Sequence, residues 1–191
     1  MTDDAPAIAS VSTGVPTGRL GIWWFLAGEI VIFGGLIASY TLLRLHHPEW
    51  SEHAAHTSWV LGGLNTLVLL TSSLSMVQAF VAVTEGKPRR ALALLGITNL
   101  LALTFLVVKA FEYTNEIRHG YTIAANLFWS FYFLMTGLHA LHVIGGMVAI
   151  TVVMVGVHRG RDYQRVEYVG LYWHLVDVVW IFLYPLLYIA S

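Results

Sequence analysis

Long apolar stretches alternate with short polar segments along most of the chain. The apolar stretches cover residues 20–43, 58–84, 89–115, 124–157 and 167–190. Each reaches the roughly 20 apolar residues that a helix needs to cross a bilayer. The fourth exceeds that length, so its helix is expected to tilt or to begin late. The pattern predicts an all-α integral membrane bundle of five transmembrane helices.

The polar segments between these stretches are too short for a second domain. Residues 19–191 are therefore predicted to form a single transmembrane domain. Residues 1–18 are polar and lack the basic segment and apolar core of a secretory signal. We interpret them as a short mobile tail.

Composition supports a membrane protein and excludes several kinds of site. Hydrophobic residues make up 57% of the chain and charged residues 11%, whereas soluble domains carry about 25% charged residues. The chain has no cysteine, which excludes disulfides, thiolate metal sites and cysteine nucleophiles. It has no basic tract of the kind that binds nucleic acid.

The basic residues of the connecting segments predict the orientation. One side of the predicted bundle carries Arg19, Lys87, Arg89, Arg90, Arg159, Arg161 and Arg165. The other side carries Arg44 and Arg118. Because cytoplasmic segments are enriched in Lys and Arg, we expect a cytoplasmic N-terminus and a C-terminus outside, in the periplasm of a bacterium.

Small, hydroxyl-bearing and aromatic side chains predict how the helices meet. Close helix approach is expected at the small-residue pairs Gly34/Ala38, Gly35/Ser39 and Gly145/Ala149. Hydrogen bonds to other helices are expected from Asn65, Thr66, Thr71, Ser72, Ser73 and Ser75. Interfacial aromatic belts are expected from Trp23, Trp24, Tyr168, Tyr172 and Trp173 at the basic side, and from Trp129 and Tyr132 at the other.

Ionisable residues within the apolar stretches need a specific explanation, because a charge at the bilayer centre costs ~2.5–3.5 kcal/mol. They are Glu29, Lys109, Glu112, His139, His142, His174 and Asp177. Counting the helical rise from each end predicts that Glu29, His139, His142, His174 and Asp177 share one layer of the bundle. Lys109 and Glu112, three residues apart, are predicted to form an intramembrane ion pair nearer the outer face.

Three explanations of the polar layer remain open from the residues alone. The first is structural, with buried groups that hydrogen-bond across helices. The second is a haem or metal site, in which His139 and His142 share one face and His174, Glu29 and Asp177 could complete the ligand set. The third is a proton or ion path.

Several blocks resemble a known family in their order along the chain. "LGIWWFLAGEIVIFGG", "LNTLVLLTSS", "FEY", "FYFLMTGLHALHVIGG" and "YWHLVDVVWIFLYPLLY" are similar to subunit III of the haem–copper oxidases, the cytochrome c oxidase family. The resemblance covers nearly the whole chain after residue 18. Several residues match characteristic positions of the family. Glu29 matches a buried carboxylate, Glu112 the acid of the "EY" motif, and Glu167 an interfacial acid. His139 and His142 match the paired histidines, and His174 and Asp177 match the "WHxVD" motif.

The resemblance implies a non-catalytic subunit of a respiratory oxidase in the bacterial inner membrane. Catalytic, cofactor and metal residues are then expected to be absent from this chain. Haem and copper would lie in partner subunits, and the large subunit I would reduce O₂ to water and pump protons. The subunit is expected to stabilise subunit I, bind phospholipid, support proton uptake and guide O₂. The polar layer would be structural, lipid-facing or part of a gas channel.

The chain also departs from the seven-helix form of the family. The first two helices of that form are missing, and Lys109 stands where an uncharged polar residue is expected. The electron donor, cytochrome c or quinol, stays open. The alternatives are an accessory subunit of a nitric oxide reductase, whose related proteins share similar "YWH" blocks, and an autonomous haem or metal membrane protein.

Overall fold

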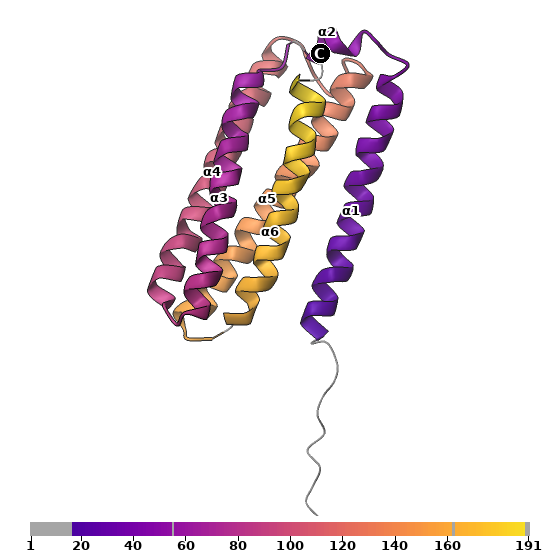
Figure 1. Cartoon of the computed structure of the whole chain (residues 1–191). Coiled ribbons are helices and arrows are strands. Elements are labelled where there is room, and N and C mark those ends of the chain that lie inside the picture. Colours follow the sequence, from indigo (N-terminus) through magenta and orange to yellow (C-terminus); the bar gives the residue numbers. More distant parts are fainter. Residues whose placement is uncertain (1–16, 55, 162, 190–191) are drawn as a thin grey trace, which may run out of the picture.

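The computed structural model describes residues 17–54, 56–161 and 163–189, so most of the predicted tail lies outside the described residues. The chain runs through α1 (Thr17–Arg44), α2 (Trp50–Ala54), α3 (Trp59–Thr84), α4 (Pro88–Arg118), α5 (Leu127–His158), α6 (Tyr163–Tyr184) and the π-helical turn η1 (Pro185–Ile189). All described elements are helical, and α1, α3, α4, α5 and α6 are long and apolar enough to cross a membrane. The predicted five-helix fold is confirmed, and the short α2 was not foreseen (Figure 1).

Local capping chemistry sets the helix boundaries. Asn126 precedes α5 and accepts a hydrogen bond from the Trp129 backbone N–H at 3.0 Å. This N-cap explains why the helix begins at Leu127 and not at the start of the apolar stretch. Gly86, Gly120 and Gly160 adopt positive φ just after α3, α4 and α5. Glycine adopts this left-handed conformation without a steric penalty, so it ends these helices cleanly.

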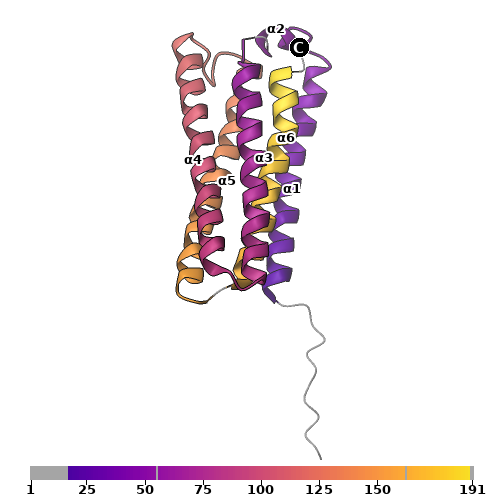
Figure 2. The same ribbon diagram turned by 60° about the vertical axis from the view of Figure 1, so that its left-hand side comes forward.

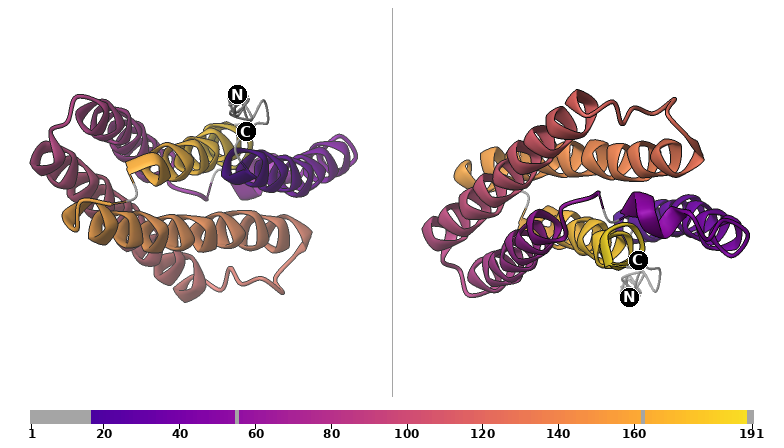
Figure 3. Two further views of the ribbon diagram at one scale, coloured as in Figure 1. Left: turned by 90° about the horizontal axis from the view of Figure 1, so that it is seen from below. Right: turned by 90° about the horizontal axis from the view of Figure 1, so that it is seen from above.

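The helices lie side by side along one common direction (Figure 2). Antiparallel α3 and α4 pack together, α6 packs against α3 and α5, and α4 packs against α5. Viewed along their axes, α1 lies at one edge of the molecule, next to α6 (Figure 3). We call the end where α1 begins the basic end, because Arg19, Lys87 and Arg159 lie there; α2 covers the opposite end.

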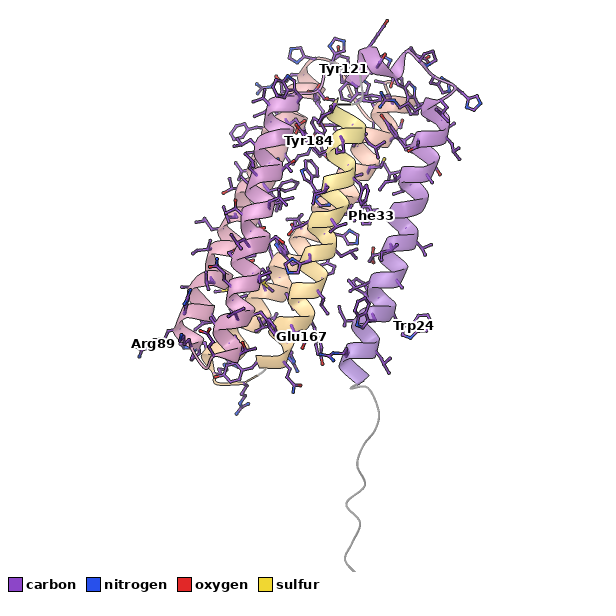
Figure 4. The ribbon with its side chains drawn as sticks, in the orientation of Figure 1. Trp24, Phe33, Arg89, Tyr121, Glu167 and Tyr184 are labelled. Carbon is purple, nitrogen blue, oxygen red and sulfur yellow. The ribbon has the colours of Figure 1, made fainter. Side chains whose placement is uncertain are left out.

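Large aromatic side chains fill the interior. Trp129, Tyr132 and Trp173 are fully buried, so the expectation that they belong to interfacial belts is wrong. They pack against other aromatic rings or against Gly146 inside the bundle. Trp23 and Trp24 of α1 are exposed, as expected of belt residues. Figure 4 shows Trp24 on the outer side of α1 and Phe33 on the side that faces α6.

Glycines allow close packing at positions other than those predicted. A Cβ atom added to Gly34 or Gly35 would meet no heavy atom within 4 Å, so the expected close approach does not occur there. A Cβ on Gly146 would lie 2.6 Å from the Trp173 ring. A Cβ on Gly62 would lie 2.8 Å from the Tyr184 ring. These two glycines make room for aromatic rings of α6, not for another backbone.

The end of α6 changes geometry at a proline. Pro185 has no N–H to donate into the helical ladder, and the following turn is π-helical. The Leu186 carbonyl accepts hydrogen bonds from Tyr40 Oη at 3.2 Å and from Arg44 Nη1 at 3.1 Å. Two α1 side chains therefore satisfy a backbone group that the helix itself leaves open.

Candidate functional site

The predicted polar layer is divided between two sides of α6. On one side, Nε2 of His142 in α5 lies 2.8 Å from Oε2 of Glu29 in α1. Nδ1 of His142 lies 2.8 Å from the Leu138 carbonyl of its own helix. Since that carbonyl can only accept, Nδ1 carries a proton. Tyr172 of α6 donates to the His142 carbonyl at 2.9 Å, so this cluster joins three helices.

On the other side of α6, polar side chains meet α3. Ser73 Oγ lies 2.7 Å from His174 Nδ1. One residue earlier on each helix, the Trp173 indole N–H donates to Ser72 Oγ at 3.0 Å. These paired contacts fix the register of α6 against α3.

Asp177 differs from its neighbours because neither carboxyl oxygen has a hydrogen-bond partner among the described residues. The residue is 3% exposed. The Ser73 hydroxyl lies close enough to interact with the Asp177 carboxyl group, and it is also 2.7 Å from His174 Nδ1. The "WHxVD" pair therefore consists of a histidine bonded to α3 and a buried carboxyl group beside the same serine.

His139 is enclosed by aromatic rings. It is fully buried, and neither ring nitrogen has a hydrogen-bond partner among the described residues. Its ring centroid lies 5.5 Å from that of Phe105 and 5.2 Å from that of Trp180. His139 therefore does not join the contact between His142 and Glu29.

Lys109 and Glu112 lie at the centre of a separate cluster nearer the opposite end. Their Nζ and Oε2 atoms are 2.9 Å apart, and both side chains are buried. Lys109 also donates to the hydroxyl groups of Tyr132 at 3.1 Å and Tyr188 at 2.7 Å. Tyr132 donates to the other carboxyl oxygen of Glu112 at 2.9 Å. Each charge is thus compensated by several hydrogen bonds, as a buried pair requires.

The two tyrosines of this cluster were missed in the sequence. Tyr132 resembles a belt residue, and Tyr188 lies beyond Pro185, where the helical register cannot be extrapolated.

The remaining motif acid, Glu167, forms an ion pair with Arg19 at 2.7 Å on the basic end of α1 and α6.

The predicted hydrogen bonds of α3 mostly reach other helices. Besides Ser72 and Ser73, Thr66 accepts from the Trp180 indole at 3.0 Å and Ser75 lies 2.6 Å from Thr98 Oγ1. Thr71 is the exception, because its hydroxyl donates to Leu67 of the same helix.

A metal-binding arrangement is not formed by the described side chains. No group of three or more His, Asp or Glu side chains within residues 17–54, 56–161 and 163–189 is placed to hold an ion. His139, His142 and His174 instead lie against Trp180, Glu29 and Ser73 respectively. The geometry thus supports helix-to-helix contacts over a shared ligand set.

Polar groups also connect the loops at the opposite end. The Nε2 atom of His53 in α2 lies 3.1 Å from the Nδ2 atom of Asn126. Asn126 uses its other side-chain atom, Oδ1, to cap α5, so its amide nitrogen must face His53. Because an amide nitrogen only donates, His53 Nε2 accepts and is unprotonated.

Comparison with known proteins adds independent information. The family model described as cytochrome c oxidase subunit III matches residues 8–191. Cytochrome c oxidase subunit 3 of Thermostichus vulcanus is 35% identical over 177 residues, which cover 90% of this chain and 87% of that protein. A probable quinol oxidase subunit 3 of Staphylococcus saprophyticus is 32% identical, with 100% and 98% covered. A haem–copper oxidase subunit I+III of Aeropyrum pernix is 31% identical over 90% of this chain and 22% of that protein.

Proposed function

Because the chain belongs to the cytochrome c oxidase subunit III family, we propose that it stabilises the catalytic subunit of a haem–copper oxidase without taking part in the chemistry. Membership makes it an accessory subunit of such an oxidase and a multi-pass membrane protein, which in bacteria lies in the plasma membrane. The family match over residues 8–191 carries the proposal. It favours an oxidase over a nitric oxide reductase.

The interior of the bundle supports a non-catalytic role. The described histidines of the polar layer contact Glu29, Ser73 or aromatic rings. Haem and copper are accordingly proposed to reside in partner subunits, and O₂ reduction and proton pumping belong to the complex.

Subunit I is the proposed main partner. In the Aeropyrum pernix relative, the name of a single chain joins subunits I and III, which supports direct contact between the two. Much of α1 is open to such a partner or to lipid, since within the described part of this helix Leu26, Phe33 and Tyr40 are its buried hydrophobic residues.

Phospholipid is the proposed small-molecule ligand. A hollow of about 410 Å³ lies between α1 and α6. Ile30, Phe33, Gly34, Ile37, Leu175, Val178, Val179 and Phe182 line it. An entirely apolar surface of this size suits an acyl chain. We further propose that the basic end faces the cytoplasm, where the subunit would support proton uptake by subunit I.

The test is purification through an affinity tag on this chain in mild detergent, followed by a reduced-minus-oxidised spectrum. Haem bands should accompany a large partner, and the chain stripped from it should be colourless. Mass spectrometry of the partner then identifies the oxidase and its electron donor. Haem or metal that stays with the isolated chain would refute the proposal and restore a site at His139, His142 and His174.

A further inference from the structure

We propose that a water-filled inlet opens at the basic end between α3 and α6 and leads to Asp177. The inlet would let this buried carboxyl group exchange protons with the solution on that side. The inlet depends on how α3 packs against α6 and not on the identity of the enzyme complex.

The first observation is a pocket of the right place and size. It has a volume of about 260 Å³ and lies between Met76, Val77 and Phe80 of α3 and Val166, Glu167, Gly170, Leu171 and His174 of α6. A water molecule occupies about 30 Å³ of liquid volume, so several fit. Glu167 brings a charged group to the mouth, where it pairs with Arg19. His174 brings a polar ring to the inner end.

The second observation is a set of polar groups without enough protein partners. Both Asp177 oxygens are buried without a hydrogen bond to a described residue. Buried carboxyl groups are rarely left without partners, because desolvation without compensation is costly. Ser73 lies between His174 and Asp177. These three side chains together supply the two to four polar contacts that an ordered buried water requires.

Charged groups on the neighbouring helices do not serve as partners for the Asp177 carboxyl group. On α1 and α5, Glu29 and His142 bind each other, and His139 is enclosed by Phe105 and Trp180. On α3, the facing groups are the uncharged Ser72 and Ser73. His174 is thus the ionisable side chain that contacts Ser73 next to Asp177. Water that enters past His174 can reach Asp177.

The natural absence of cysteine allows a direct test by thiol accessibility. We would introduce Ser73→Cys and measure its reaction with a charged, membrane-impermeant methanethiosulfonate in the intact complex. Thr71→Cys and Ser72→Cys are matched controls on the same helix. Thr71 is exposed on the bundle surface, whereas Ser72 is fully buried beneath Trp173. The S73C thiol should react about tenfold faster than either control, because a thiol needs water to ionise.

Two further variants test the route. Val77→Trp places a large ring on the partly exposed wall of the pocket and should slow the S73C reaction about tenfold. Asp177→Leu removes the inner polar group and should also slow it. In sealed vesicles, S73C should react from the same side as Lys87→Cys, which marks the basic end. If S73C prevents assembly, Gly170→Cys replaces it, since a Cβ there lies 3.6 Å from Met76 and fits.

Four results would overturn the inlet. The first three are an S73C rate no higher than that of the controls, S73C reaction from the side opposite to K87C, and an S73C rate that Val77→Trp leaves unchanged. Reaction with the uncharged N-ethylmaleimide but not with the charged reagent would show a pocket filled by lipid, which also excludes the inlet.

Discussion

The indole N–H of Trp173 donates a hydrogen bond to Oγ of Ser72 over 3.0 Å, which joins α6 to α3 inside the bundle. The Trp173 ring also lies against Gly146 of α5, where an added Cβ atom would be 2.6 Å from the ring. One side chain of the "YWH" block thus holds three helices together. Its hydrogen bond fixes orientation, and its ring fills a space that only glycine leaves open.

This packing predicts that Gly146→Ala destabilises the subunit. The added methyl group must displace Trp173 or shift α5, and overpacking of this kind costs about 1–3 kcal/mol. Thermal loss of the subunit from the purified complex, followed by native electrophoresis, measures the effect. Gly34→Ala and Gly35→Ala are the controls, because nothing lies within 4 Å of their added Cβ atoms. Equal stability of all three variants would contradict the packing argument.

The buried pair of Lys109 and Glu112 predicts that removing one charge destabilises the chain more than removing both. Lys109→Met leaves a buried carboxylate without its cation, which is expected to destabilise the chain by about 3–5 kcal/mol. The double variant Lys109→Met/Glu112→Gln should recover most of this loss, since no buried charge remains. Midpoints of thermal unfolding in detergent give both values. Strictly additive effects would show that the two charges do not interact.

The contact between Glu29 and His142 predicts how firmly α1 is held. Glu29→Leu leaves the His142 ring without its partner, at a cost of about 1–3 kcal/mol. Spin labels attached at Val31 and Val148, which are exposed on α1 and α5, should then report a broader distance distribution. Glu29→Gln keeps a hydrogen-bonding group, so its distance distribution should remain close to that of the parent. Thr41→Val, which removes a hydroxyl bonded within α1, serves as control. An unchanged distribution in Glu29→Leu would mean that this contact does not position α1.

The contact between His53 and Asn126 predicts how firmly α2 is held at the opposite end. His53 Nε2 accepts a hydrogen bond from the Asn126 amide, so His53→Phe removes the acceptor and leaves that donor unpaired. Hydrogen exchange of residues 50–54 should then be faster than in the parent, because a lost hydrogen bond costs about 0.5–1.5 kcal/mol. His53→Gln offers an amide oxygen as acceptor and should exchange at close to the parent rate. Equal exchange in His53→Phe and the parent would refute the link.

The sequence by itself determined the architecture of this protein. Apolar length alone predicted the five long helices, because the bilayer requires about 20 apolar residues for each crossing. The hydrogen bonds of α3 to other helices were also predictable from Asn65, Thr66 and the serines, since such groups need partners away from water. The short α2 was not predictable, because five residues show no periodicity.

Only the tertiary structure decided which polar groups meet. Depth along the membrane follows from counting residues, but the rotation of each helix about its axis does not. Packing therefore placed His142 against Glu29, His174 against Ser73, and His139 among aromatic rings, although all lie at similar depth. Packing also turned Trp129, Tyr132 and Trp173 inward, where the sequence predicted lipid-facing belts. The rotation of a helix depends on the shapes of all its neighbours at once, and local sequence does not contain that information.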